Sequence, residues 1–450
     1  MRRTRGLVLL PALAALVMPP AALDAQQPQS VTAIRAGTLI DGTGAAPVKN
    51  AVILVQGERI TAVGAGLAIP KGAVLIDLSG ATVLPGFIDA HVHLVGRTLG
   101  DGDWQHARLT QPPTELVLLG AAHAQETLEA GFTSVRNVGA PALGDLALRN
   151  AINAGWVVGP RILGAGIAFG IQGGHCDGTD GLVPQIYGHD AGVEEGVADG
   201  VDAVRRAVRY MVKYGADWIK ICATGGVLSP TDSAGLQQYS EEEMRAVVET
   251  AAQLERKVAA HAHGTAGIKA AVRAGVASIE HGSILDEEAV QLMKQHGTYL
   301  VPTLLAGYTV ESLAVARKLP PSVAAKALAI APRMRRSFKM AVDAGVKIAL
   351  GTDAGVMQHG TNAREFELMV KYGLAPMQAI QAGTLNGATL LGTQAEVGSL
   401  QVGKLADIVA VKGDPLQDIT TLQHVDFVMK GGTVVKQNGQ VAGRSVAGVP

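Results

Sequence analysis

Short apolar runs alternate with helix-forming segments between residues 86 and about 390, and this alternation constrains the fold more than any other feature of the chain. The helix-forming segments are rich in alanine, glutamate, lysine and arginine, and Ser240 to Glu243 has the pattern of a helix-capping box. They span residues 114–130, 201–214, 240–255, 265–274 and 286–296. The runs expected as strands are 83–91, 133–138, 161–168, 218–222, 257–261, 278–281, 299–303 and 347–352. This rhythm predicts an α/β fold, a (β/α)8 TIM-like barrel whose active site lies at the carboxyl ends of the strands.

A second texture, of β-branched runs separated by glycine-containing turns, occupies both ends of the chain. Residues 31–80 hold four such runs, and the same texture returns only after residue 406. Two separate hairpin appendages are the alternative, but each would bury too little apolar surface to be stable alone. The sequence therefore predicts one discontinuous β-sandwich, built from residues 26–85 and 391–450, beside a barrel of residues 86–390.

Residues 1–25 have the layout of a secretory signal peptide. Arginines precede an apolar run from Gly6 to Met18, and small residues follow up to Ala25. A retained membrane anchor is the alternative, although the apolar run is short for a bilayer span. We therefore expect a periplasmic or secreted protein that has no membrane association once the signal is cleaved.

The charge of the chain indicates which class of partner it binds. The formal net charge is −1 at pH 7 and the charged residues are scattered, so the chain lacks the basic stripe of a nucleic-acid-binding protein. A small-molecule partner is the expectation.

Cys176 and Cys222 are too few for a disulfide framework, so we expect free thiols, with one bridge as the alternative in an oxidising compartment.

Side chains that bind metals gather where the predicted barrel strands end. His91 and His93 are two residues apart in a strand, so their imidazoles point the same way and can share one ion. Lys220 lies inside an apolar strand, where an unpaired ammonium is strongly destabilising, so a chemical role explains it better than a structural one. Each histidine taken alone could be a hydrogen-bonded core residue. The strand-end set is His91, His93, His261, His263, Glu280, His281 and Asp353. Together these residues predict a metal centre at the mouth of the barrel.

Seven motifs together resemble those of one enzyme family. They are PGFIDAHVH at 85–93, TSVRNVG at 133–139, GGHCD at 173–177, DWIKI at 217–221, AHAHG at 260–264, IEHG at 279–282 and GTDA at 351–354. Over essentially the whole chain after the signal, the sequence resembles the amidohydrolase superfamily of binuclear-metal hydrolases. Within that superfamily it is most similar to the prolidase-like group of Xaa-Pro dipeptidases and related carboxypeptidases, and above all to bacterial ochratoxin-hydrolysing amidohydrolases.

The resemblance implies two zinc ions, or similar divalent ions, in the barrel. Their ligands would be His91, His93, Lys220, His261, His281 and Asp353. Lys220 would be carboxylated by carbon dioxide and bridge the ions, and His263 is the alternative to His261 as the ligand from the fifth strand. A metal-bridging hydroxide would attack the scissile carbonyl, with Asp353 as the proton shuttle. The family also implies a homo-oligomer of up to an octamer.

A prolidase-like enzyme must recognise a free α-carboxylate, which needs arginine, histidine or tyrosine near the metals. The candidates are Arg136, His175, Tyr239 and His263, while Asn137 stands where this family's motif has an aspartate. The expected reaction is hydrolysis of the amide bond to a C-terminal amino acid in dipeptides or N-acyl amino acids, ochratoxin A included. The alternatives are a cyclic-amide or imidazolone hydrolase and a non-catalytic metal-binding barrel. The presence of both Lys220 and Asp353 favours catalysis.

Overall fold

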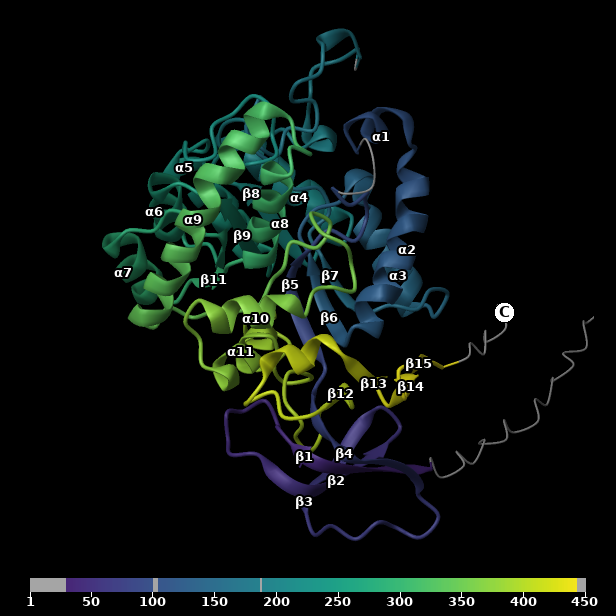
Figure 1. Cartoon of the computed structure of the whole chain (residues 1–450). Coiled ribbons are helices and arrows are strands. Elements are labelled where there is room, and N and C mark those ends of the chain that lie inside the picture. The colour runs from purple at the N-terminus through teal and green to yellow at the C-terminus, as the bar shows by residue number, and fades with distance from the viewer. Residues whose placement is uncertain (1–29, 100–103, 187, 443–450) are drawn as a thin grey trace, which may run out of the picture.

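The computed structural model describes residues 30–99, 104–186 and 188–442 (Figure 1). The signal peptide expected at residues 1–25 lies outside these ranges. Within them, none of the helices combines the length and the apolar character that crossing a bilayer requires.

Strands from both ends of the chain share one eight-stranded sheet, at the bottom of Figure 1. The strands are β1 (Val31–Leu39), β2 (Val48–Gln56), β3 (Arg59–Ala65), β4 (Val74–Pro85), β12 (Ile408–Lys412), β13 (Val425–Lys430), β14 (Thr433–Gln437) and β15 (Gln440–Val441). Their order is β15-β14-β13-β12-β4-β1-β2-β3, so the two ends meet where β4 pairs antiparallel with β12. Ile34, Ile53, Val83, Phe427 and Met429 are buried in the apolar cluster that both ends contribute to.

The central strands form two parallel sheets. One contains β5 (Phe87–Val92), β6 (Phe132–Asn137) and β7 (Arg161–Gly164), and the other β8 (Trp218–Cys222), β9 (Lys257–Ala262), β10 (Ser278–His281) and β11 (Tyr299–Val301). An isolated parallel bridge between Phe169 and Ile221 joins the two sheets on one side. On the other side, Ile348 is bridged to Leu300 of β11, and Ala354 to Val92 of β5.

The first and the eighth predicted strands need the largest corrections, and the strands expected at 161–168 and 299–303 end earlier, at Gly164 and Val301. The expected strand 83–91 is wrong in its start, because Val83 to Pro85 belong to β4 of the terminal sheet and β5 begins at Phe87. A Cβ at Gly86 would lie 2.2 Å from Thr133 Oγ1, so this glycine allows the chain to pass closely between the sheets. Residues 347–352, all of them described, contribute an isolated bridge instead of the expected eighth strand.

Helices cover the central strands, with α2 and α3 beside β6 and β7, and α5 to α9 around the second sheet (Figure 1). The helices are α1 (Trp104–Thr110), α2 (Pro113–Glu129), α3 (Gly144–Asn153), α4 (Val201–Lys213), α5 (Glu241–Gln253), α6 (Thr265–Ala274), α7 (Glu287–His296), α8 (Leu304–Val315), α9 (Pro321–Ala344), α10 (Arg364–Lys371), α11 (Pro376–Ala382) and α12 (Leu385–Leu391). The predicted capping box is confirmed, since Ser240 Oγ accepts a hydrogen bond from the backbone N–H of Glu243 at 3.2 Å.

Candidate metal centre and active site

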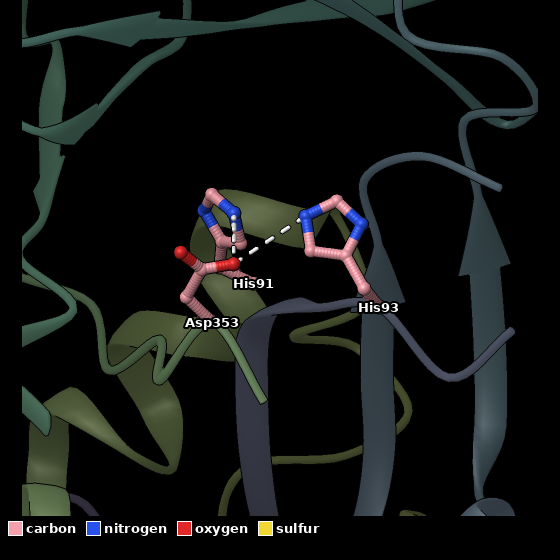
Figure 2. A group of neighbouring side chains, drawn as sticks. All are labelled: His91, His93 and Asp353. Atoms are coloured by element: carbon pink, nitrogen blue, oxygen red, sulfur yellow. Dashed lines mark ion pairs between the residues drawn. The ribbon is translucent and has the colours of Figure 1, made fainter. Parts of the chain in front are cut away.

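His91, His93 and Asp353 converge at the carboxyl ends of the central strands (Figure 2). The Nε2 atoms of both histidines lie 3.4 Å from Asp353 Oδ1. One ligand atom from each of the three residues falls within 4.8 Å of the other two. Two imidazole nitrogens and a carboxylate oxygen form a donor set that suits zinc and related divalent ions.

Hydrogen bonds behind the two histidines fix the direction of their rings. His91 Nδ1 lies 2.7 Å from Glu280 Oε2, and His93 Nδ1 lies 2.9 Å from the carbonyl oxygen of Gly139. When Nδ1 donates its proton to such an acceptor, Nε2 carries the free lone pair and the ring is held in one orientation. Both Nε2 atoms therefore face Asp353 and are candidate metal ligands.

Arg136 is not the substrate contact that the sequence suggested. Its guanidinium is fully buried and donates to the carbonyl oxygen of Ala90 at 2.6 Å, to Ser278 Oγ at 3.1 Å and to Glu280 Oε1 at 2.8 Å. Burial opposes ionisation of Glu280, but the Arg136 charge and the His91 hydrogen bond outweigh it and lower the pKa of Glu280 to about 2. Arg136 therefore keeps Glu280 charged beneath His91.

Arg136→Met is expected to lower both thermal stability and metal content. It leaves the Glu280 carboxylate buried without its cation, which destabilises a fold by about 3–5 kcal/mol, and loosens His91, for which losses of about 10–100-fold in metal affinity are typical. Melting curves and metal analysis measure both effects. Arg273→Met, which removes a surface ion pair to Glu241, is the control and should change neither. A rise in KM alone, with stability and metal content intact, would return Arg136 to the role of substrate contact.

Three more candidate ligands lie close to His91, His93 and Asp353. They are Lys220, His261 and His281. The rings of His91 and His281 are 5.1 Å apart between centroids, and those of His261 and His281 are 4.7 Å apart. Burial lowers the pKa of Lys220 to about 8, against the opposing charges of Glu280 and Asp353. Burial also lowers the pKa of His261 and of His281 well below the usual value, so both rings are neutral, the form that binds metals.

His263 also approaches His281, with ring centroids 5.0 Å apart. Its Nδ1 lies 2.7 Å from Ser283 Oγ, whereas His261 Nε2 lies 3.2 Å from the carbonyl oxygen of Gly225. These contacts engage one ring nitrogen of each histidine, so the other nitrogen of either ring is a candidate metal donor. The assignment of His261 as the ligand from β9 stays a prediction.

Three residues of this region have left-handed backbone conformations, which residues other than glycine rarely adopt. His281 has φ 68°, Thr303 φ 48° and Asp353 φ 62°. Thr303 Oγ1 lies 2.7 Å from His281 Nδ1, so one of these residues orients another. Such conformations are unfavourable by roughly 1–3 kcal/mol each and cluster at functional sites, which supports a functional role for this mouth of the strands.

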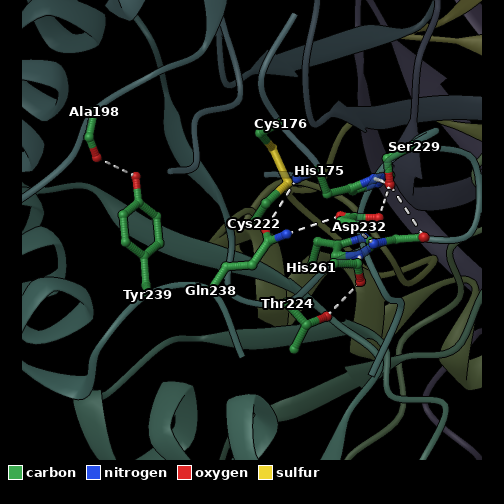
Figure 3. The surroundings of a disulfide bond; sticks show 12 residues. His175, Cys176, Ala198, Cys222, Thr224, Ser229, Asp232, Gln238, Tyr239 and His261 are labelled. Carbon is green, nitrogen blue, oxygen red and sulfur yellow. Dashed lines mark hydrogen bonds between the residues drawn. A yellow bond between two sulfur atoms is a disulfide. The ribbon is translucent and has the colours of Figure 1, made fainter. Parts of the chain in front are cut away.

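Tyr239 is the second wrong substrate candidate. Its hydroxyl is buried and donates to the carbonyl oxygen of Ala198 at 2.8 Å, away from the histidines (Figure 3). His175, in contrast, stacks on His261 with 4.2 Å between ring centroids. His175 and His263 both line the pocket next to Asp353, so they stay the candidates for the carboxylate contact.

The expectation of free thiols is also wrong. Cys176, adjacent to His175, forms a disulfide with Cys222 at the end of β8, with 5.8 Å between the Cα atoms (Figure 3). The loop after β7 folds back over β8, and this proximity of residues 46 positions apart is a tertiary feature that the local sequence does not show. The disulfide ties the loop that carries His175 to the strand that carries Lys220.

A polar network behind His175 was missed by the sequence analysis. His175 Nδ1 lies 3.0 Å from Ser229 Oγ, which donates to Asp232 Oδ1 at 2.5 Å. Lys326 of α9 donates to the carbonyl oxygen of Ser229 at 2.6 Å and to Asp232 Oδ1 at 3.2 Å. The network holds His175 from behind, and only the position of Lys326 within an otherwise apolar helix face could have hinted at it.

Comparison with known proteins agrees with this geometry. Residues 82–435 match the Amidohydrolase family. The ochratoxinase of Aspergillus niger is 35% identical over 441 residues, which cover 93% of this chain and 90% of the relative. The structure of a Xaa-Pro dipeptidase with methionine bound in the active site has a TM-score of 0.87 and 42% identity, covering 90% of this chain and 100% of that chain. A prolidase complexed with N-methylphosphonate-L-proline has a TM-score of 0.82 and 34% identity, covering 91% and 100%.

The resemblance to prolidase-like and ochratoxin-hydrolysing enzymes is thereby confirmed. These relatives imply a TIM barrel accompanied by a β-sandwich, and they support hydrolysis of amide bonds. The donor set of His91, His93 and Asp353 fits the divalent ions that the family uses. This chain belongs to the amidohydrolase family and is a metal-dependent amidohydrolase.

Proposed function

We propose that this protein hydrolyses the amide bond to a C-terminal amino acid in dipeptides or N-acyl amino acids. Ochratoxin A, which would give ochratoxin alpha and phenylalanine, is one candidate substrate. The observation that carries the proposal is the convergence of His91, His93 and Asp353 next to a pocket. Asp353 lines this pocket together with His175 and His263. Relatives named ochratoxinase and Xaa-Pro dipeptidase support the substrate class.

The residues present fit a binuclear zinc centre. The proposed ligands are His91, His93, Lys220 in its carboxylated form, His261, His281 and Asp353. Imidazole nitrogens and carboxylate oxygens are among the donors that zinc prefers. Carboxylation of Lys220 would turn a buried amine, whose pKa burial lowers to about 8, into an anionic oxygen donor. When bound at these residues, two divalent ions would provide Lewis acidity, which would favour hydroxide near neutral pH and would polarise the scissile carbonyl.

Asp353 is suited to move the proton in this reaction. Burial acts to raise its pKa, but the neighbouring His91 and His93 outweigh burial and lower it, so the carboxylate is ionised at neutral pH. It lines the pocket directly, where an attacking nucleophile and a leaving amine would meet. We assign it the step of accepting a proton from the nucleophile and delivering it to the leaving amine.

The proposed active site belongs to a two-domain protein that is exported and assembles into a homo-oligomer. The catalytic unit is a (β/α)8 barrel of residues 86–390, accompanied by a β-sandwich of residues 26–85 and 391–450. Export to the periplasm or the medium follows from the signal predicted at residues 1–25. Assembly into a homo-oligomer follows from the family resemblance alone.

Metal-loaded protein, assayed on a panel of dipeptides and N-acyl amino acids, is expected to release the free amino acid. The preparation should contain up to two divalent ions per chain, and chelation should abolish turnover because hydroxide formation depends on the ions. Metal analysis and amino-acid release measure these outcomes. Turnover of cyclic amides alone would replace the proposal with ring opening, and metal binding without any turnover would indicate a non-catalytic barrel. Turnover by protein that contains no metal would refute the proposed mechanism.

A further inference from the structure

The pocket beside the candidate metal centre has one polar side and one apolar side. The space between its lining residues is about 480 Å³, which includes a part that is open to solvent. The polar side consists of His175, His261, His263, His281 and Asp353. All the other described residues that line it are apolar, and most of them come from α8 and α9. A side chain that enters this space from the metal centre therefore meets only hydrocarbon, backbone and the thioether of Met334.

Gly307 of α8 and Met334 of α9 determine how much of this space is open. Glycine in a helix interior is destabilising by roughly 0.5–1 kcal/mol relative to alanine, so its presence in α8 calls for a packing reason. An ideal Cβ at Gly307 would lie 2.6 Å from Met334 Sδ. Because Gly307 lacks a Cβ, Met334 can lie against the helix. Any side chain at position 307 would displace the thioether of Met334, and both residues line the pocket.

We propose that this apolar wall binds an uncharged, apolar side chain of the substrate's C-terminal amino acid, and that Gly307 and Met334 set its maximum size. The inference rests on the proposed function and specifies the substrate class. His175 and His263 share the pocket with the wall, so an α-carboxylate at their ring nitrogens places the adjoining side chain against α8 and α9. A relative that binds methionine in its active site is consistent with such an occupant. A charged side chain would be desolvated here without any partner on the wall.

The first test uses substrates that share one acyl group and end in alanine, leucine, methionine, phenylalanine, aspartate or lysine. We expect kcat/KM for methionine and phenylalanine to exceed that for aspartate and lysine by at least about 100-fold. Gly307→Ala should lower kcat/KM for phenylalanine by about 10–100-fold and change that for alanine by less than about threefold. Adding Met334→Ala to the Gly307→Ala variant should restore kcat/KM for the phenylalanine substrate, because it removes the displaced thioether.

Met340→Ala is the matched control, since Met340 lies on the same helix with 36% of its surface exposed and should leave every rate unchanged. Binding of free amino acids, measured by calorimetry, gives a readout that does not need turnover. Phenylalanine and methionine should bind at least about tenfold more tightly than aspartate and lysine, and Gly307→Ala should weaken phenylalanine alone.

Failure of this inference can be told apart from failure of the proposed function. If the substrates are hydrolysed without preference for the C-terminal side chain, or if the Gly307 variant discriminates between acyl groups instead, the assignment of the wall is overturned while the amidohydrolase reaction stands. If no member of the series is hydrolysed and no free amino acid binds to metal-loaded protein, the proposed function and this inference both fall.

Discussion

Replacing Lys220 with alanine is expected to abolish turnover and to remove bound metal in the same step. In the proposed centre the carboxylated Lys220 would supply oxygen donors to the ions, and Glu280 cannot take its place because Arg136 and His91 hold its carboxylate. Metal content and amino-acid release, measured on the same preparation, test this. Added short-chain carboxylic acids should restore part of both, since they supply the missing oxygens.

The control for this variant is Lys257→Ala. Lys257 lies at the start of the neighbouring strand β9, where its ammonium donates to the carbonyl oxygen of Leu390 at 3.0 Å, and His261 lies near the opposite end of that strand. It should retain metal and activity even if its stability falls. Undiminished turnover in Lys220→Ala would refute the bridging role.

Asp353→Asn is expected to reduce kcat by 10²-fold or more, on the order of a lost proton-transfer group, while substrate binding persists. The amide is nearly isosteric with the carboxylate and can still offer an oxygen, but it cannot accept and return a proton. Asparagine also tolerates the left-handed conformation that Asp353 adopts at φ 62°, so the backbone should keep its shape. Substrate should still raise the melting temperature of the variant, because binding stabilises the folded state.

Asp343→Asn serves as the comparison, since Asp343 lies on the exposed face of α9 in an ion pair with Lys339. Steady-state kinetics on both variants separate a loss of kcat from a general effect of the substitution. Near-normal kcat in Asp353→Asn would place the shuttle elsewhere, and His263 and Glu280 would be the next residues to test.

The elements that local sequence specifies were predicted well. β8 and β10 begin and end at the residues predicted for them, and α6 spans the segment that its composition indicated. The start of β5 and the eighth strand were not predicted correctly, because both depend on which neighbouring strand accepts their backbone hydrogen bonds. Val83 pairs with Ala410, more than 300 positions away, and no local pattern encodes that choice.

The same distinction separates the parts of the site. His91, His93 and Asp353 were found because ligand types at strand ends carry a chemical meaning by themselves. Arg136 was assigned to substrate, although the desolvation argument applied to Lys220 held for it as well: it also lies inside a predicted barrel strand, and a buried cation needs a buried anion. That anion is Glu280, which lies 144 positions away in the sequence.

The disulfide between Cys176 and Cys222 bears on which metal the protein acquires. Cys222 is two residues from Lys220 in β8, on the same face of the strand. In a chain that has not been oxidised, two sulfur donors would stand next to the nitrogen and oxygen donors, and thiolates attract softer ions such as copper(I) and compete for zinc. Oxidation removes both sulfurs from this competition. An oxidising compartment would therefore give the enzyme a uniform metal composition as well as a fixed loop, and protein made in a reducing cytoplasm should be reoxidised before metal is added.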